Sequence, residues 1–317
     1  MMKQIEDEWS DEWFQYIKNH NRPWNFCKIC SNPNLTWNTV KKNPQIKWNY
    51  RYLSCNPNIT WKIVTENPDC NWCYQMLSLN PNITINIVID NIKENWSVDN
   101  LLKNPRITWK IIKKYPLIFS KPNKFIFNEN LTFDNILEKN NIYWDYYNLS
   151  KHKCITWEIV QKNIKKPWCI LLLSENPNIT WNIVKKNTGY TWNYNFLSCH
   201  PNFTWDIIIN NKKPWNIRWA GKNKNVTWDI IENNNNLNWD YRFISCNPNL
   251  DWEIVENNDR KWNYFYLSGN PMTKARETFF YKRLRQEFMK EGGLCEEIMK
   301  NRFHPKNIIL FSEWGHH

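Results

Sequence analysis

The residues best suited to chemistry are two cysteine pairs, Cys27-x-x-Cys30 and Cys70-x-x-Cys73. Two such pairs form a tetrahedral zinc site when they converge. These pairs lie two units apart in a repeated sequence, and the three-residue spacing of Cys27 and Cys30 is also one turn of a predicted helix. Cysteine elsewhere recurs at one repeat position, which favours a packing role. We therefore expect neither a metal nor a cofactor. The recurring cysteines are Cys55, Cys199 and Cys246.

The six histidines give no pattern typical of catalysis. None lies beside a cysteine or serine in a recognisable nucleophile arrangement, and His200 replaces the asparagine of a repeated Asn-Pro turn. The chain contains no glycine-rich phosphate loop and no His-Glu-x-x-His motif. We expect a protein that is not an enzyme and that has no small-molecule substrate.

A set of lysines is the remaining candidate site. Each follows a recurring tryptophan by four or five residues, so the set would align as a basic stripe along a repeat array. Such a stripe is typical of phosphate-backbone binding. The alternative is that lysine in the last turn of a helix complements the helix dipole, and acidic residues interrupt the stripe. The candidate residues are Lys41, Lys42, Lys113, Lys114, Lys162, Lys185 and Lys186.

The elements that would position these side chains are set by the hexapeptide Asn56-Pro57-Asn58-Ile59-Thr60-Trp61 and its copies. Two tryptophan positions recur with a period of 24 residues, shortened to 23 in places, which gives ten repeats and a final half. The first position holds Trp24, Trp48, Trp72, Trp96, Trp144, Trp168, Trp192, Trp215, Trp239 and Trp262. The second holds Trp37, Trp61, Ile85, Trp109, Phe133, Trp157, Trp181, Trp205, Trp228 and Trp252.

One repeat unit predicts two short helices and two turns. Apolar spacing over Trp48 to Asn56 favours a first helix, which ends before Pro57. Thr60 is placed as the N-cap of a second helix, Trp61 to about Glu66, as Asp251 is in another unit. Asparagines such as Asn67 follow the second helix, where a left-handed residue is common. Helices this short need their neighbours, so we expect the tryptophans to pack as two aromatic ladders along the array.

The fold class predicted is therefore all-α, a right-handed solenoid forming one elongated unit with a helical cap at each end. Residues 1–23 form an amphipathic capping helix with Ile5, Trp9, Trp13 and Ile17 on one face. The repeat array covers residues 24–271 and a C-terminal helical cap covers residues 272–317. Units near Phe119–Tyr143 and Gly221–Trp228 depart from the pattern, and either bend the array or carry a binding loop.

Composition indicates the broad class of protein but does not identify a partner. The formal net charge is +12, yet residues 200–269 carry eight basic and eight acidic side chains. The first residues lack the pattern of a secretory signal, and no apolar run reaches the ~20 residues of a membrane span. We expect a soluble intracellular chain with reduced cysteines and no membrane partner.

The hexapeptide, with the preceding Leu53-Ser54-Cys55, resembles repeat proteins of giant DNA viruses of the mimivirus type over Trp24 to Pro271. This resemblance implies a viral source, in the host cytoplasm or the virion, and an architecture without an assigned activity. The period and the Asn-Pro turn also resemble the leucine-rich variant repeat, which implies a right-handed superhelix of short α and 3₁₀ helices. Tryptophan here replaces the leucine and valine of that family.

Three functions stay open on the sequence. The first is a non-enzymatic scaffold that binds another macromolecule, with a protein as the expected partner, because solenoids present long surfaces for binding. The second is nucleic-acid binding through the lysine stripe. The third is a structural component of a virus particle.

Overall fold

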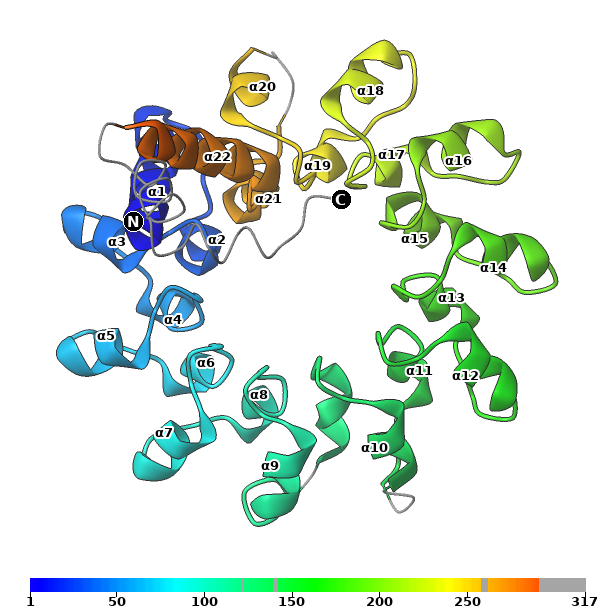
Figure 1. Ribbon diagram of the computed structural model, residues 1–317, viewed down its shortest axis with the longest axis horizontal. Helices are drawn as coiled ribbons and strands as arrows, with labels where there is room; N and C mark the ends of the chain where they lie inside the picture. The colour runs from blue at the N-terminus through cyan, green and yellow to red at the C-terminus, as the bar shows by residue number, and fades with distance from the viewer. Residues whose placement is uncertain (121, 139–141, 258–261, 291–317) are drawn as a thin grey trace, which may run out of the picture.

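The computed structural model describes residues 1–120, 122–138, 142–257 and 262–290. All regular structure within these residues is helical, as the sequence predicts. Two layers of short helices alternate along the chain and form an inner and an outer ring (Figure 1). The inner helices are α2 Phe26–Ser31, α4 Tyr50–Leu53, α6 Tyr74–Leu77, α8 Val98–Leu101, the 3₁₀ helix η1 Pro122–Phe127, α11 Tyr146–Leu149, α13 Ile170–Leu173, α15 Tyr194–Cys199, α17 Ile217–Ala220, α19 Tyr241–Ile244 and α21 Tyr264–Gly269.

The outer helices begin at the second tryptophan position, as predicted. They are α3 Trp37–Lys42, α5 Trp61–Glu66, α7 Ile85–Asp90, α9 Trp109–Lys114, α10 Phe133–Glu138, α12 Trp157–Lys162, α14 Trp181–Lys186, α16 Trp205–Asn210, α18 Trp228–Asn233 and α20 Trp252–Glu256. The Thr60 hydroxyl accepts from the Ile63 amide at 3.4 Å, and the Asp251 carboxylate accepts from the Ile254 amide at 2.8 Å. Both N-caps are therefore confirmed.

Two local expectations are wrong. The first helix of a unit does not include its tryptophan, because Asn49 is extended and its side chain caps α4 at the Tyr52 amide. The left-handed residue expected after the second helix is also absent at Asn67, where φ is −132° and ψ is 63°. There the asparagine side chain donates to the Ile63 carbonyl at 2.7 Å, so the helix end is satisfied without that conformation.

Tryptophans of different units pack together, in a pattern that differs from two separate ladders. The second tryptophan of one unit contacts the first tryptophan two units later, as in Trp37–Trp72, whose ring centroids are 5.6 Å apart. Four of the thirteen tryptophans named as core are buried, and the other nine are partly exposed and pack against the buried core. Those buried are Trp48, Trp109, Trp157 and Trp192. Those partly exposed are Trp37, Trp61, Trp72, Trp168, Trp181, Trp205, Trp228, Trp239 and Trp252.

A buried asparagine ladder joins each unit to the preceding one. The side-chain amide of Asn56 donates to the carbonyls of Cys30, Asn32 and Leu35 at 2.8, 2.9 and 3.3 Å. The bond to the carbonyl of the preceding ladder residue, as from Asn56 to Asn32, recurs at the ninth position of each unit, counted from its first tryptophan. The ladder residues are Asn32, Asn56, Asn80, Asn104, Asn128, His152, Asn176, His200, Asn223, Asn247 and Asn270.

The array closes on itself, which the sequence did not predict. Asn32 in the first unit donates to the carbonyls of Ser268 and Asn270 in the last unit, both at 3.0 Å. The Ser268 hydroxyl accepts from the Asn25 amide at 2.9 Å, as Ser54 accepts from Cys73 inside the array. We call this junction, where α2 packs beside α21, the seam. The elongated shape that we expected is replaced by a ring.

The terminal helices α1 Met2–Asn19 and α22 Thr273–Met289 complete the seam. Helix α1 lies between α20 and α3 in the outer ring (Figure 1) and buries the predicted face of Ile5, Trp9, Trp13 and Ile17. Trp13 stands 24 residues before Trp37, so α1 supplies the outer helix that the last half repeat lacks. The two helices serve one junction together instead of capping two separate ends.

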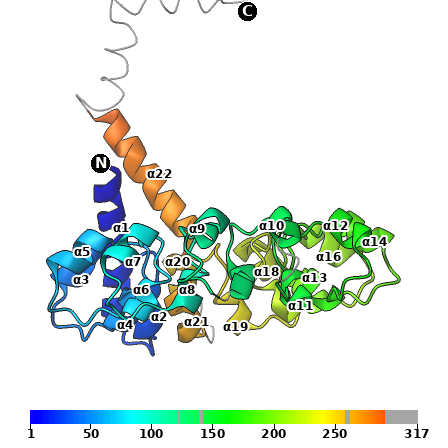
Figure 2. The ribbon, with the colours of Figure 1, turned by 90° about the horizontal axis from the view of Figure 1, so that it is seen from below.

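Helix α22 packs against α1 and projects from one face of the ring (Figure 2). The Trp9 and Phe279 ring centroids are 5.4 Å apart, and Arg283 pairs with Glu8 at 2.6 Å. The single helix predicted for Lys274 to Glu291 is confirmed over the described residues. The rest of the predicted C-terminal cap, residues 291–317, lies outside the described residues, and the handedness of the array stays a prediction.

Candidate macromolecule-binding surface

The ring offers two walls with different side chains. Counted from the first tryptophan, the third residue of a unit packs edge-on against the next unit's first tryptophan, as in Tyr50–Trp72 at 5.3 Å and 90°. At about 100° per residue, the fifth and eighth positions lie on the opposite side of the inner helix. They therefore face away from the outer ring. The fourth position is exposed in ten of the eleven units. We call the fourth and fifth positions of the inner helices, with the eighth position in or just after each helix, the inner wall.

Basic residues predominate on the inner wall. The two acidic residues are Asp99, which pairs with Lys124, and Glu175. The basic residues number eight and come from inner helices all around the ring: Lys28, Arg51, Lys103, Lys124, Lys151, Arg218, Lys222 and Arg242. Because basic residues outnumber acidic ones on this surface, the inner wall favours an anionic ligand.

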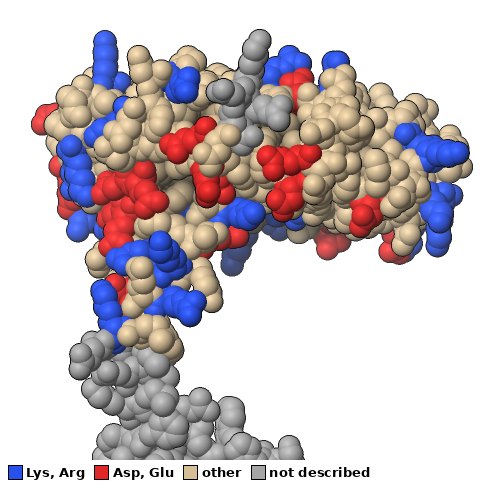
Figure 3. Space-filling view, turned by 90° about the horizontal axis from the view of Figure 1, so that it is seen from above, with Lys and Arg blue, Asp and Glu red and all other residues tan. Residues whose placement is uncertain are grey.

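We call the surface of the outer helices the outer wall. Over one sector its charge is negative, opposite to that of the inner wall. Helices α16, α18 and α20 carry no lysine or arginine. Their carboxylates are Asp206, Asp229, Glu232, Glu253 and Glu256. Figure 3 shows acidic side chains spread over one side of the ring, with others at the base of α22. The inner helices of this sector, α17 and α19, carry Arg218 and Arg242, so they differ in charge from the three outer helices.

The lysine set predicted from the sequence lies on the outer wall. Lys41 and Lys42 end α3, Lys113 and Lys114 end α9, Lys162 ends α12, and Lys185 and Lys186 end α14. The intervening helices α5, α7 and α10 have no basic residue in the last turn. The structure therefore places these lysines in separate groups and does not join them into a stripe.

Several of these lysines have acidic partners. Lys42 pairs with Asp11, and this hydrogen bond raises the pKa of the lysine. Lys113 pairs with Glu138 at 2.8 Å, and Lys162 pairs with Glu158 at 2.6 Å. Partnered lysines attract phosphate less strongly than free ones, so the outer wall is the weaker candidate for an anionic ligand.

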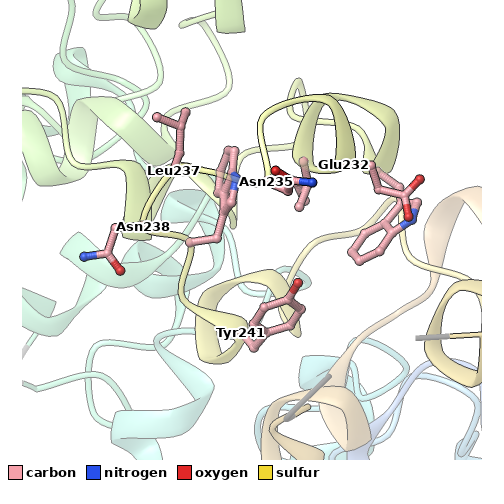
Figure 4. A pocket seen from close by; sticks show the side chains of 8 residues that line it. Glu232, Asn235, Leu237, Asn238 and Tyr241 are labelled. Atoms are coloured by element: carbon pink, nitrogen blue, oxygen red, sulfur yellow. The ribbon is translucent and has the colours of Figure 1, made fainter. Parts of the chain in front are cut away.

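Two crevices of the ring are lined mainly by polar groups. One, of about 210 Å³, lies between α18 and α19 (Figure 4). Glu232 belongs to α18, Asn235, Leu237 and Asn238 to the following loop, and Tyr241 to α19. A larger groove of about 850 Å³ between α1, α3 and α5 mixes Lys3, Lys41 and Lys62 with Glu6, Asp7 and Glu66. Neither combines an apolar pocket with convergent polar groups, as small-molecule sites do.

Comparisons with protein-family models, curated proteins and solved structures found no match.

Of the nine described cysteines, one is buried and eight are partly exposed within the repeat units. Cys30 is buried in α2, and burial raises the pKa of its thiol to about 11. Burial likewise raises the pKa of Cys55. A high pKa disfavours the thiolate that binds metals or attacks substrates. Within the described part of the chain, no group of three or more His, Cys, Asp or Glu side chains could hold a metal ion.

Sequence reasoning missed the inner wall as a surface. Its basic residues stand at three different positions of the unit, and no single position is basic in more than three of the eleven units. A signal was present in the fifth position, which is aromatic in Tyr52, Phe196, Trp219, Phe243 and Tyr266 although it is not buried in the core.

None of the helices among the described residues has the length and hydrophobicity to cross a bilayer.

Proposed function

We propose that this chain is a non-enzymatic, ring-shaped scaffold that binds another macromolecule. The observation that carries the proposal is the division of each unit into a constant buried part and a variable exposed part. The ladder position is asparagine or histidine in all eleven units, whereas the fourth position ranges from Arg51 through Asp99 to Leu171. A surface that varies on a fixed frame is typical of repeat proteins that bind macromolecules.

A protein is the partner class expected from repeat architecture in general. The basic inner wall favours a second candidate, a nucleic acid, because phosphate backbones are bound by lysine and arginine. The carboxylates of α16, α18 and α20 give one sector of the outer wall a charge that repels the same ligand. Either partner is consistent with a scaffold, and they differ in which wall they would occupy.

Site-specific photo-crosslinking in the cells that make the chain tests the scaffold proposal. Leu171 on the inner wall and Ile209 on α16 are 47% and 49% exposed, so a photoreactive amino acid at either site is equally accessible. We expect discrete macromolecular adducts at Leu171 and few at Ile209. Adducts at neither site would contradict the proposal, and nuclease treatment of the adducts would separate nucleic acid from protein.

A further inference from the structure

The inner wall is not uniform, and one part of it combines cations with aromatic rings. Six consecutive inner helices, α15, α17, α19, α21, α2 and α4, cross the seam (Figure 1). Their fifth positions hold Phe196, Trp219, Phe243, Tyr266, Lys28 and Tyr52. We call the inner wall of these six helices the seam arc. It exists as one surface because the ring is closed.

Aromatic rings follow one another along the seam arc. The ring centroids of Phe196 and Trp219 are 5.5 Å apart, and those of Trp219 and Phe243 are 5.0 Å apart. All three side chains are partly exposed. Phe265 and Tyr266, with exposed fractions of 46% and 42%, continue the series at the seam. The arc thus presents ring surface to solvent in successive units.

Cations accompany these rings. Arg218, Arg242 and Arg51 stand one residue before an aromatic residue in three of the six units. Lys28 crosses the seam, where its stem lies beside the position that a Cβ at residue 269 would take and its ammonium lies 5.3 Å from the Phe265 ring centroid. From the N-caps to the eighth positions of these six helices, the one carboxylate is Asp240, which pairs with Arg242 at 2.6 Å.

Cations of different units act on one thiol of the arc. Burial raises the pKa of Cys246, and the charges of Lys222 and Lys28 oppose this effect. Lys222 belongs to the unit of α17 and Lys28 to the unit of α2, on either side of α19 and α21. Positive charge therefore continues along the arc instead of ending at the seam.

We propose that the seam arc binds single-stranded nucleic acid, with phosphates on its cations and unpaired bases against its aromatic rings. This proposal rests on the scaffold function and names its partner. A single strand offers one phosphate and one base at every step, which matches a surface that repeats a cation and a ring in successive helical units. A duplex hides its bases, and an acidic peptide has no aromatic group at every step.

The test is fluorescence anisotropy of a labelled 20-nucleotide oligo(dT) and oligo(U) with the full chain at two salt concentrations. We expect the chain to bind both oligonucleotides. The logarithm of the association constant should fall linearly with the logarithm of the salt concentration, with a slope of about −0.7 for each phosphate contact. Trp219→Ala should weaken binding about tenfold by loss of stacking. The exposed pair Arg218→Glu and Lys222→Glu should weaken it further and reduce the salt slope.

The matched control is Lys185→Glu with Lys186→Glu on the outer wall, which should leave affinity within about twofold. Circular dichroism and thermal unfolding verify that each variant folds. No binding by the unaltered chain, or equal loss in the control, would overturn the proposal. Equal binding of poly-glutamate, with the same sensitivity to the seam-arc variants, would overturn the assignment to nucleic acid while supporting the scaffold. Photo-crosslinked protein adducts without oligonucleotide binding would likewise overturn the assignment to nucleic acid and support the scaffold.

Discussion

The side-chain amide of Asn32 donates to the backbone carbonyl of Asn270 at 3.0 Å, across 238 residues of sequence. Inside the array, Asn56 makes the equivalent bond to Asn32 at 2.9 Å across 24 residues. The junction of first and last units is therefore built like every other junction. A ring of this kind has no exposed stacking face, so the requirement of a solenoid for end caps is met by closure.

Replacing ladder asparagines should destabilise the fold at the seam as it does elsewhere. Asn104→Ala removes the bonds to the carbonyls of Ser78, Asn80 and Ile83 and leaves buried acceptors without this donor. We expect a loss of about 3 kcal/mol in the free energy of unfolding, measured by urea denaturation. Asn32→Ala should cost a similar amount. A negligible effect at Asn32 beside a large one at Asn104 would mean that the seam is open in solution.

The apolar contact between the terminal helices should matter more than their ion pair. Trp9 is 3% exposed, and its indole donates to the Asn34 side chain at 2.9 Å. Trp9→Ala should cost about 3–5 kcal/mol by loss of buried surface and the cavity left behind. Arg283→Gln removes a half-exposed pair with Glu8 and should cost less than about 1 kcal/mol. Thermal unfolding of both variants measures the order, and a reversed order would contradict it.

Acid should weaken the ladder at its two histidines. The Nε2 atoms of His152 and His200 lie 2.9 and 3.0 Å from the carbonyls of Asn128 and Asn176, and each Nδ1 accepts from a backbone amide. Burial lowers the pKa of both imidazoles, with a smaller effect of the Lys153 charge at His152. The unfolded chain, with histidine pKa near about 6.5, then binds more protons than the folded chain.

The contribution of the neutral histidines to the free energy of unfolding is therefore fully present above the histidine pKa of the unfolded chain. It is lost as the pH falls from that value through the lowered pKa of the folded chain. Unfolding free energies across this range measure the slope. The double variant His152→Asn and His200→Asn restores the usual ladder residue and should lose this part of the pH dependence. An unchanged slope in the double variant would show that other groups cause it.

The threonine caps allow a matched comparison. The Thr60 hydroxyl accepts from the Ile63 amide, whereas Thr180 occupies the same position and makes no such bond. Thr60→Ala should cost about 1 kcal/mol, and Thr180→Ala clearly less. Equal losses in urea denaturation would show that the threonine methyl, and not the cap, stabilises these helices.

Much of the local fold could be predicted from the sequence because it depends on neighbouring residues. The outer helix Trp61–Glu66, the Thr60 cap and the apolar face of α1 follow from spacing and capping rules. The start of the inner helix was missed because Asn49 was not recognised as its cap. Propensity and spacing give element types more reliably than their ends.

Closure could not be predicted because it depends on a sum of small rotations between units. Each 24-residue repeat defines its contact with the next, and only their total decides whether Asn32 meets Asn270. The ladder itself left a signal: Asn128 and Asn223 keep the asparagine where the following proline is lost, so the asparagine has a role beyond the turn. Part of the candidate surface was missed for the same reason, since closure alone brings the inner wall of α2 and α4 beside that of α21.

The most direct test of closure is the distance between the eighth positions of the first and last units. Spin labels attached through unnatural amino acids at Ser31 and Gly269 span the seam, and labels at Ser31 and Cys55 span an ordinary junction in the same register. Pulsed electron paramagnetic resonance should give both pairs the same short distance distribution. A Ser31–Gly269 distribution much longer and broader than the Ser31–Cys55 control would contradict the closed ring.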